Sequence, residues 1–445
     1  MEMIGLILAV LVLAVGSYKG IGALAVSLMA SAVVIITNRM DVWQGFMQNY
    51  MGGYTGAYMN FFLLFAAASL YASFMDKSGS ATAIGYKMID WFGKKRVMLV
   101  STLTVAVLTY GGVSLFVVIF AVVPILYVLF KESGLPRHFI VAATTAGSAT
   151  FTMTTLPGTP ALTNIIPSNF LPTTMWAAPV LSLIASALTF TLVMLYMTIE
   201  ERRIRARGET FSFPEGVDPS NYNVPDRSTL PNAFVAFAPI VVLLGIILVG
   251  SQLISRGSLT LTANQLAIFA MLIGTIIVWA LNFKRIKDSG VKGIINRGVE
   301  GGIAGIGGFA AVLAFGAVVS ASPAFQETLL PWVLGLDVNM YVRAIIATVA
   351  VSATTGSSSG GVNIMFQNLG DIFIGSGVNY EILHRLVSVA ASSLDTLPHS
   401  PGLFVTFAVL GLTHKEAYKH VFFTSVVATS VTTLFILAVA LLGIF

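Results

Sequence analysis

The chain has 445 residues, of which 56% are hydrophobic and only 10% charged, and its mean hydropathy is +0.88. This composition excludes an ordinary soluble domain, in which roughly 25% of residues are charged. The net charge of +5 does not indicate a nucleic-acid partner, because the basic residues lie in short clusters between apolar runs. The absence of cysteine excludes disulfides, thiolate metal sites and cysteine nucleophiles.

Apolar runs at the start of the chain predict membrane helices. Residues 4–18 and 20–37 are near the short end of the roughly 17 to 25 residues that a spanning helix uses, and predict a helical pair. The first run lacks the basic lead and cleavage site of a signal peptide, so we interpret it as a membrane helix. Residues 54–76 predict a third span, and the mixed segment 77–96 an interfacial helix.

The next segments predict interrupted helices. Residues 97–130 are apolar but contain Gly111-Gly112, which favours two short helices folded back as a re-entrant hairpin over one long span. Residues 137–170 contain a helix break, and residues 173–200 predict a long helix that ends in a run of arginines.

The only extended polar segment, 208–231, predicts a linker between a first half (1–207) and a second half (232–445). The second half repeats the order of the first. Its predicted elements are spans at 232–253, 262–283 and 298–320, an apolar run from 339 interrupted at 354–361, a second break within 378–412, and a final helix at 414–445.

The two breaks share the pattern T-L-P-x-[ST]-P, at Thr155–Pro160 and again at Thr396–Pro401. Prolines three residues apart remove backbone donors and clash with the preceding turn, so each segment should interrupt its helix. Exposed peptide groups at membrane depth are tolerated only where they face protein or a watered cavity. Matched breaks in two halves of a chain therefore indicate a transporter binding site near the midplane.

Each break should restart as a helix, because Thr159-Pro160 and Ser400-Pro401 place a capping hydroxyl before a proline at the first helical position. The amino end of such a helix carries partial positive charge and unpaired N–H groups, which suit a carboxylate. Gly158 and Thr396, within the two motifs, are further candidate substrate-binding residues.

Charge predicts the topology. If each half contributes five crossings and one hairpin, nearly all basic residues fall on one side, and the other keeps little more than Arg39, Arg256 and Arg343. By the positive-inside rule this places the linker in the cytoplasm and both termini outside. We therefore expect an all-α polytopic membrane protein with about ten transmembrane helices, two re-entrant hairpins and an inverted structural repeat.

Ionisable groups distinguish the second break. Residues 140–198, around the first break, contain no Asp, Glu, Lys, Arg or His, whereas Asp395 and His399 flank the second. A charge within the membrane is costly and normally functional, so we interpret this pair as the proton-handling groups. Alternatively, His399 only bonds a freed carbonyl and Asp395 only caps a half-helix. Arg385 is a candidate anchor for an anion, or lies near the outer surface.

The segments Phe151–Pro167 and Asp395–Gly402 resemble the gluconate permease (GntP) family of the ion transporter superfamily, and the resemblance covers nearly the whole chain. It implies symport of small organic anions with protons and an elevator-type homodimer. It also implies substrate contacts at Ser114, Thr155, Thr159, Asn164, Asn363, His399 and Ser400. Family members have Leu-Pro-Pro-His-Pro at the first break, where this chain has Leu156-Pro157-Gly158-Thr159-Pro160. This difference favours a smaller, less hydroxylated acid, such as a hydroxybutyrate-like monocarboxylate, over gluconate.

The first hypothesis is thus a proton-coupled symporter of a small organic anion in the cytoplasmic (inner) membrane of a bacterium, with no cofactor. A sodium-coupled carboxylate symporter is the second, since freed carbonyls also bind Na⁺. An anion channel is the third. An enzyme is disfavoured, because the chain has no dense cluster of metal ligands and no nucleophile–base pair.

Overall fold

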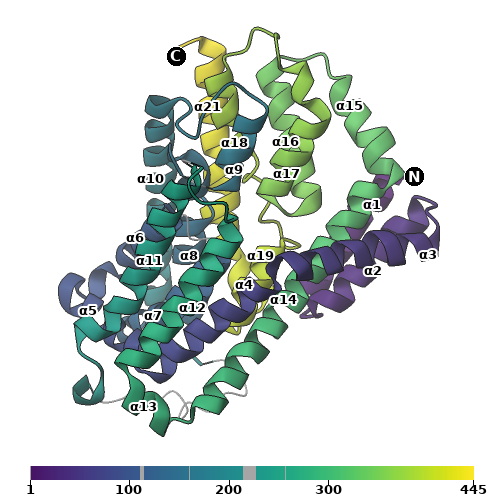
Figure 1. Ribbon diagram of the computed structural model, residues 1–445. Coiled ribbons are helices and arrows are strands. Elements are labelled where there is room, and N and C mark those ends of the chain that lie inside the picture. The colour runs from purple at the N-terminus through teal and green to yellow at the C-terminus, as the bar shows by residue number, and fades with distance from the viewer. Residues whose placement is uncertain (1, 111–114, 160, 214–226, 256, 445) are drawn as a thin grey trace.

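The computed structural model describes residues 2–110, 115–159, 161–213, 227–255 and 257–444, which form helices joined by turns and loops (Figure 1). The predicted tip of the first hairpin (111–114), Pro160 and most of the predicted linker (214–226) lie outside the described residues.

The elements of the first half follow the predicted order, with short π and 3₁₀ segments (η) between α-helices. They are α1 (Glu2–Tyr18), α2 (Ala23–Thr37), α3 (Val42–Gln44), η1 (Gly45–Tyr50), α4 (Met51–Lys77), α5 (Ser80–Phe92), η2 (Lys94–Arg96), α6 (Val97–Tyr110), α7 (Leu115–Ser133), η3 (Arg137–Phe139), α8 (Ile140–Ser148), η4 (Phe151–Thr155), α9 (Leu162–Ile165), η5 (Ile166–Asn169) and α10 (Pro179–Ala206).

The second half begins after η7 (Arg227–Thr229). Its elements are α11 (Ala233–Ser255), α12 (Ala263–Leu281), α13 (Phe283–Asp288), α14 (Val291–Ala321), η8 (Ala324–Leu329), α15 (Leu330–Leu334), α16 (Met340–Thr355), α17 (Ser358–Leu369), η9 (Gly370–Ile372), α18 (Tyr380–Ala390), α19 (Pro401–Leu410), α20 (His414–Val421), η10 (Phe422–Val427) and α21 (Ala428–Leu442).

Six helices in the described part are long and apolar enough to cross a membrane: Val42–Lys77, Pro179–Ala206, Ala233–Ile254, Asn264–Leu281, Val291–Ala321 and His414–Leu442. The chain is therefore an all-helical, polytopic membrane protein. The apolar helices α1, α2, α16 and α19 are shorter, with 10–17 residues. The count of ten crossings remains a prediction.

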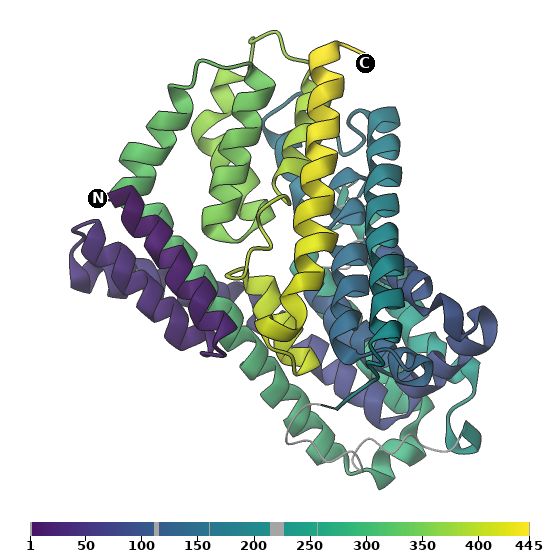
Figure 2. The ribbon, with the colours of Figure 1, turned by 180° about the vertical axis from the view of Figure 1, so that it is seen from behind.

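Two long helices, α4 and α14, pack against each other and cross the middle of the molecule (Figure 1). Small residues let their backbones approach: a Cβ added at Gly302 would lie 2.7 Å from the Cα atom of Ala66, and one at Gly298 would lie 2.8 Å from the Cα atom of Leu70. Figure 2 shows a second long pair, in which α21 runs beside α10. These two pairs join the halves of the chain.

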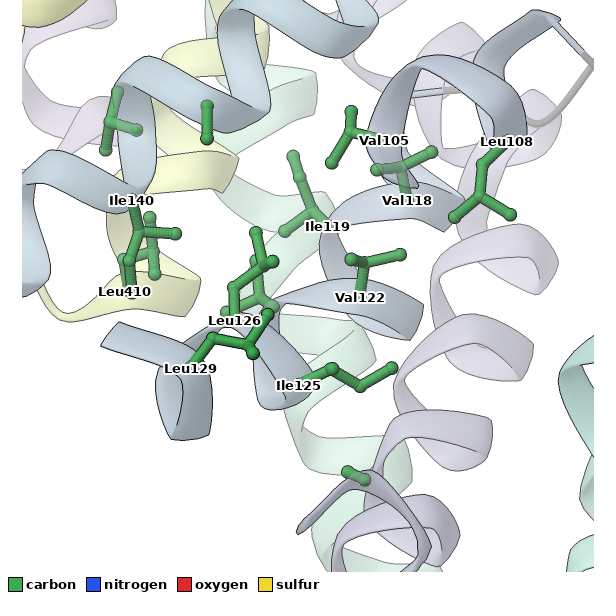
Figure 3. Close-up of a cluster of buried hydrophobic side chains, with 14 of the residues drawn as sticks. Val105, Leu108, Val118, Ile119, Val122, Ile125, Leu126, Leu129, Ile140 and Leu410 are labelled. Carbon is green, nitrogen blue, oxygen red and sulfur yellow. The ribbon is translucent and has the colours of Figure 1, made fainter. Parts of the chain in front are cut away.

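Both predicted hairpins form two packed helices, α6 with α7 and α16 with α17. Figure 3 shows Val118 and Ile119 of α7 on the side of Val105 of α6, and Leu126 and Leu129 of the same helix on the side of Ile140 and Leu410 from α8 and α19. The Tyr127 hydroxyl of α7 also donates to the Leu410 carbonyl at 3.0 Å. The first hairpin is thus packed against the helix that follows the second break.

Local sequence sets where the helices around the second break begin and end. Asn379 caps α18 by accepting from the amides of Glu381 and Ile382, and Ser357 caps α17 by accepting from the amide of Gly360. Gly356 (φ 63°) ends α16 and Gly411 (φ 59°) ends α19, both in the left-handed conformation. Local capping therefore fixes the start of the helix that precedes the second break, the end of the helix that follows it and the turn of the second hairpin.

Both predicted breaks interrupt their helices, but the first does not restart as expected. Beyond it, helix begins only at Leu162, after Ala161 in extended conformation, and α9 has four residues. A helix that starts at Pro160 was therefore a wrong prediction. The second break restarts at Pro401 as predicted.

We expect Gly302→Ala to destabilise the protein, since the new Cβ meets the backbone of α4 and overpacking costs roughly 1–3 kcal/mol. Gly307→Ala on the same helix is the control, because its nearest neighbour would be the Tyr54 hydroxyl at 3.9 Å. Thermal unfolding of the detergent-purified variants measures both effects. Equal midpoints for the two variants would contradict the close approach of α4 and α14.

Candidate functional site

The first break is a sharp turn that only glycine fits. After η4, Leu156 is extended, and Gly158 has a φ of +78° and donates its N–H to the Met175 carbonyl at 2.8 Å. A Cβ on Gly158 would lie 2.6 Å from the Trp176 ring. The predicted residue Gly158 therefore shapes the backbone, and its amide is already paired.

The Asn164 side chain stabilises the turn by hydrogen bonds. Its Nδ2 donates to the carbonyls of Thr159 and Met175, each at 2.9 Å, and this fixes the orientation of the amide. Its Oδ1 then accepts from Nε2 of His384 at 3.1 Å. Nδ1 of His384 is left to accept from the Thr173 hydroxyl at 2.8 Å. Asn164 and His384 are thus fully bonded structural residues that link the two halves.

Arg385 is buried inside the protein, with a side chain that is 0% exposed. It donates to the Thr154 carbonyl at 2.8 Å and to the Ala177 carbonyl at 3.2 Å. Thr154 lies at the carboxyl end of η4, where a cation is favourable. The guanidinium from the second half therefore satisfies carbonyls that the first break frees.

The second break, residues 391–400, is held from three directions. The Thr396 hydroxyl donates to Ser425 at 2.9 Å, the Pro398 carbonyl accepts from Nε2 of His414 at 2.8 Å, and the Ser400 hydroxyl donates to the Gly356 carbonyl at 3.1 Å. Ser400 stands at the N-cap position, but its hydroxyl makes no capping bond. The prediction that this hydroxyl caps α19 is therefore wrong, because it bonds the residue that ends α16 instead.

The same contacts recur in the two breaks. The hydroxyls of Thr155 and Ser186 lie 2.9 Å apart, as do those of Thr396 and Ser425. The Pro157 carbonyl accepts from the Tyr110 hydroxyl at 3.1 Å, much as that of Pro398 accepts from His414. Each break is thus tied to the long helix that follows it.

The proposed proton-handling residues are buried and incompletely hydrogen-bonded. The His399 side chain is 0% exposed, and neither ring nitrogen makes a hydrogen bond of normal geometry among the described residues. It lies near Phe315, Gly356 and the backbone of Ala353. Asp395 is 5% exposed; its Oδ1 is unpaired in the described part, and its carboxyl lies beside the Ser358 hydroxyl.

Other buried hydroxyls near the breaks are also unpaired within the described residues: those of Thr159, Ser352 and Ser392. Leaving a buried polar group unsatisfied costs about 1–3 kcal/mol, so native proteins keep such groups where they serve a purpose. The unpaired atoms of Ser392, Asp395 and His399 all belong to the second break. This is the part of the molecule best prepared to receive a polar ligand.

Of two further predicted residues, Ser114 lies outside the described residues, and Asn363 is half-buried on α17. In the described part no group of three His, Asp or Glu residues could hold a metal ion.

An open apolar groove of about 310 Å³ lies between α1 and α16 and reaches the second break at Leu397. The residues that line it include Leu6, Val10, Ala353, Thr354 and Leu397.

The sequence reasoning missed the partners that position the site: Ser186, Ser425, Thr173 and Tyr110. Each is an ordinary residue of a helix or loop, and only its distance from a break in space gives it a role. A usable signal was present, because Ser186 and Ser425 follow Thr155 and Thr396 by similar intervals of 31 and 29 residues.

No family model matches the chain. Over 481 aligned positions it is 28% identical to a protein of Bacillus subtilis (strain 168) described as "Uncharacterized transporter YxjC", and the match covers 100% of both chains. Together with the six apolar helices, this similarity indicates a membrane transporter rather than an enzyme.

We expect Asn164→Leu to lower stability by roughly 3 kcal/mol or more, since it removes three hydrogen bonds: those to the Thr159 carbonyl and Nε2 of His384, and one of the bonds to the Met175 carbonyl. Asn368→Leu is the matched control, because Asn368 is exposed and bonds only the Ile364 carbonyl of its own helix. Thermal unfolding of both variants decides the matter. A loss no larger than that of the control would show that the Asn164 bonds do not hold the turn.

Proposed function

We propose that this protein is a secondary active transporter that carries a small organic hydroxymonocarboxylate together with a proton. The observation that carries the proposal is the second break, where Asp395 and His399 are buried with unpaired atoms beside the amino end of α19. Buried ionisable groups in a membrane normally have a partner or a function. A carboxylate and a proton would supply the partners that these side chains lack.

The proposed architecture has ten crossings and two re-entrant hairpins in an inverted repeat, with the halves at 1–207 and 232–445 and the linker at 208–231. The recurring order of elements and the recurring break contacts support it. The distribution of basic residues supports a cytoplasmic linker, outer termini and a bacterial inner membrane. An elevator-type homodimer completes the proposal on the resemblance to the gluconate permease family.

In the proposed site, the carboxylate of the substrate lies at the amino end of α19, where the helix carries partial positive charge, near Ser400 and His399. The hydroxyls of Thr159 and Ser392, unpaired within the described residues, are available for a hydroxyl of the substrate. The apolar groove that Leu397 borders supports an acid with a short hydrocarbon part over a polyhydroxylated sugar acid. A hydroxybutyrate-like acid fits this description better than gluconate.

Coupling is tested by uptake of a labelled short hydroxymonocarboxylate into proteoliposomes. For one proton per anion, a gradient of one pH unit is worth about 1.4 kcal/mol and drives about tenfold accumulation. We expect this accumulation without sodium, and its loss on adding a protonophore. Uptake that requires Na⁺ and ignores the pH gradient favours the sodium-coupled alternative, and flux without saturation or counterflow favours a channel.

We expect His399→Ala and Asp395→Asn to abolish accumulation driven by the pH gradient, because each removes a group that can change charge. Ser289→Ala is the control, since Ser289 is exposed just after α13 and its hydroxyl bonds only the Arg285 carbonyl. The ratio of internal to external substrate at steady state is the measurement. Tenfold accumulation by both site variants would exclude Asp395 and His399 as the coupling groups.

A further inference from the structure

A second cluster of titratable groups lies on the face where α10 ends and α20 begins, away from both breaks. Nδ1 of His138 and Nε2 of His420 are 2.8 Å apart. Nε2 of His138 lies 3.2 Å from a carboxylate oxygen of Glu209, and Nδ1 of His420 lies 2.9 Å from the Tyr196 hydroxyl. Four side chains thus form one hydrogen-bonded row.

The hydrogen-bond partners in the row determine which nitrogen of each ring carries a hydrogen. The Glu209 carboxylate can only accept, so Nε2 of His138 carries a hydrogen and Nδ1 of the neutral ring is an acceptor. His420 must then donate from Nε2 and accept the Tyr196 hydrogen at Nδ1. Every nitrogen in the row has a partner while both histidines are neutral.

The joined rings can hold one additional proton. If His138 becomes charged, its Nδ1 donates to His420, which can shift its own hydrogen to Nδ1 and donate to Tyr196. A second added proton would set two N–H groups against each other at 2.8 Å and break the contact. Two separated imidazoles, in contrast, can each take up a proton.

The carboxylates around the row are paired with nearby basic side chains, so positive and negative charges nearly cancel. Glu209 also pairs with Arg207, and the 1% exposed Glu200 pairs with Lys419 at 2.6 Å and with Arg207 at 3.3 Å. Glu416 of α20 lies 4.0 Å from Arg137 of η3. On the neighbouring helix α7, Glu132 pairs instead with Lys94.

Burial lowers the pKa of His138 below its ordinary value, and the nearby Glu209 carboxylate opposes this effect. Arg207 holds the pKa of Glu209 below its usual range, so that carboxylate is ionised near neutral pH. Near neutral pH, the ring of His138 therefore donates to a charged acceptor while it is itself uncharged.

The row connects three segments that lead to the breaks. His138 lies in η3, just before α8 and the first break, and Glu209 begins the linker segment after α10. His420 lies in α20, directly before η10, whose Ser425 holds Thr396 of the second break. Separating the two rings would loosen the contact between the two halves on this face.

From this geometry we propose that His138 and His420 form a proton-binding joint between the two halves, which opens when the compartment on this face becomes acidic. Opening is coupled to the uptake of one net proton, because the closed pair holds one added proton and the open rings hold two. In the range where that proton is taken up, each pH unit of acidification shifts the equilibrium up to about tenfold toward the open joint.

The full-length chain in lipid bilayers provides the test, because its five histidines can be followed by histidine-selective ¹⁵N magic-angle-spinning NMR. Single His→Gln variants assign the signals. Between pH 8 and pH 5 we expect His138 and His420 to titrate jointly, and His420 in the His138→Gln variant to titrate alone at a changed midpoint. Independent titration of the two rings in the unaltered chain would overturn the proposal.

Hydrogen exchange of the same samples reports the opening. In the unaltered chain, each unit by which the pH is lowered should reduce the amide protection of residues 137–140 and 418–421 by up to about tenfold. This applies after correction for the pH dependence of the intrinsic exchange rates. Protection in His138→Gln and in His420→Gln should no longer depend on pH. Lys415→Gln, at an exposed position on α20, is the control and should behave as the unaltered chain does. Protection that does not change with pH in the unaltered chain would refute the joint. Neither measurement requires a transported substrate, so the outcome is independent of the proposed transport activity.

Discussion

Peptide groups freed by the two helix breaks impose the main constraint on this molecule. In a bilayer they cannot bond water, so partners must come from the protein. Arg385 supplies donors to the Thr154 and Ala177 carbonyls, and Asn164 supplies donors to those of Thr159 and Met175. Because Arg385 and its neighbour His384 belong to the other half, the first break can form only when the two halves are packed together.

The two breaks interrupt their helices in similar ways but differ in how many of their polar groups are hydrogen-bonded. The amide of Gly158 and the side chain of Asn164 are fully bonded, so much of the first break is closed to a ligand. In the second break, His399 and Asp395 keep unpaired atoms within the described residues. In the proposed site, the first break thus provides mainly a rigid wall, and the second provides the groups that can change charge. A transporter that binds a carboxylate and a proton at one place needs both a rigid frame and groups free to change partners.

Sequence reasoning predicted the elements better than the contacts. Proline spacing located both breaks, because proline acts on its own backbone. The interruption predicted at 354–361 contains the turn between α16 and α17, which is formed by Gly356 and Ser357. It failed where a side chain chooses between a local and a distant partner. Ser400 was expected to cap α19 but bonds Gly356, and the helix expected at Pro160 begins only at Leu162, beyond the turn that Asn164 holds. His384 and Arg385 could not be placed, since their partners lie more than 200 positions away.

The sequence by itself determined that this chain lies in a membrane, where its helices are interrupted, and which residues bring charge near the interruptions. Composition, hydropathy and proline chemistry are properties of short segments and can be recognised without a fold. The tertiary structure alone decided which polar groups are satisfied, that Arg385 is an internal donor and not a surface residue, and that His138 meets His420. These outcomes depend on distances between segments remote in the chain, and such distances are set by the packing of α4 on α14 and of α10 on α21.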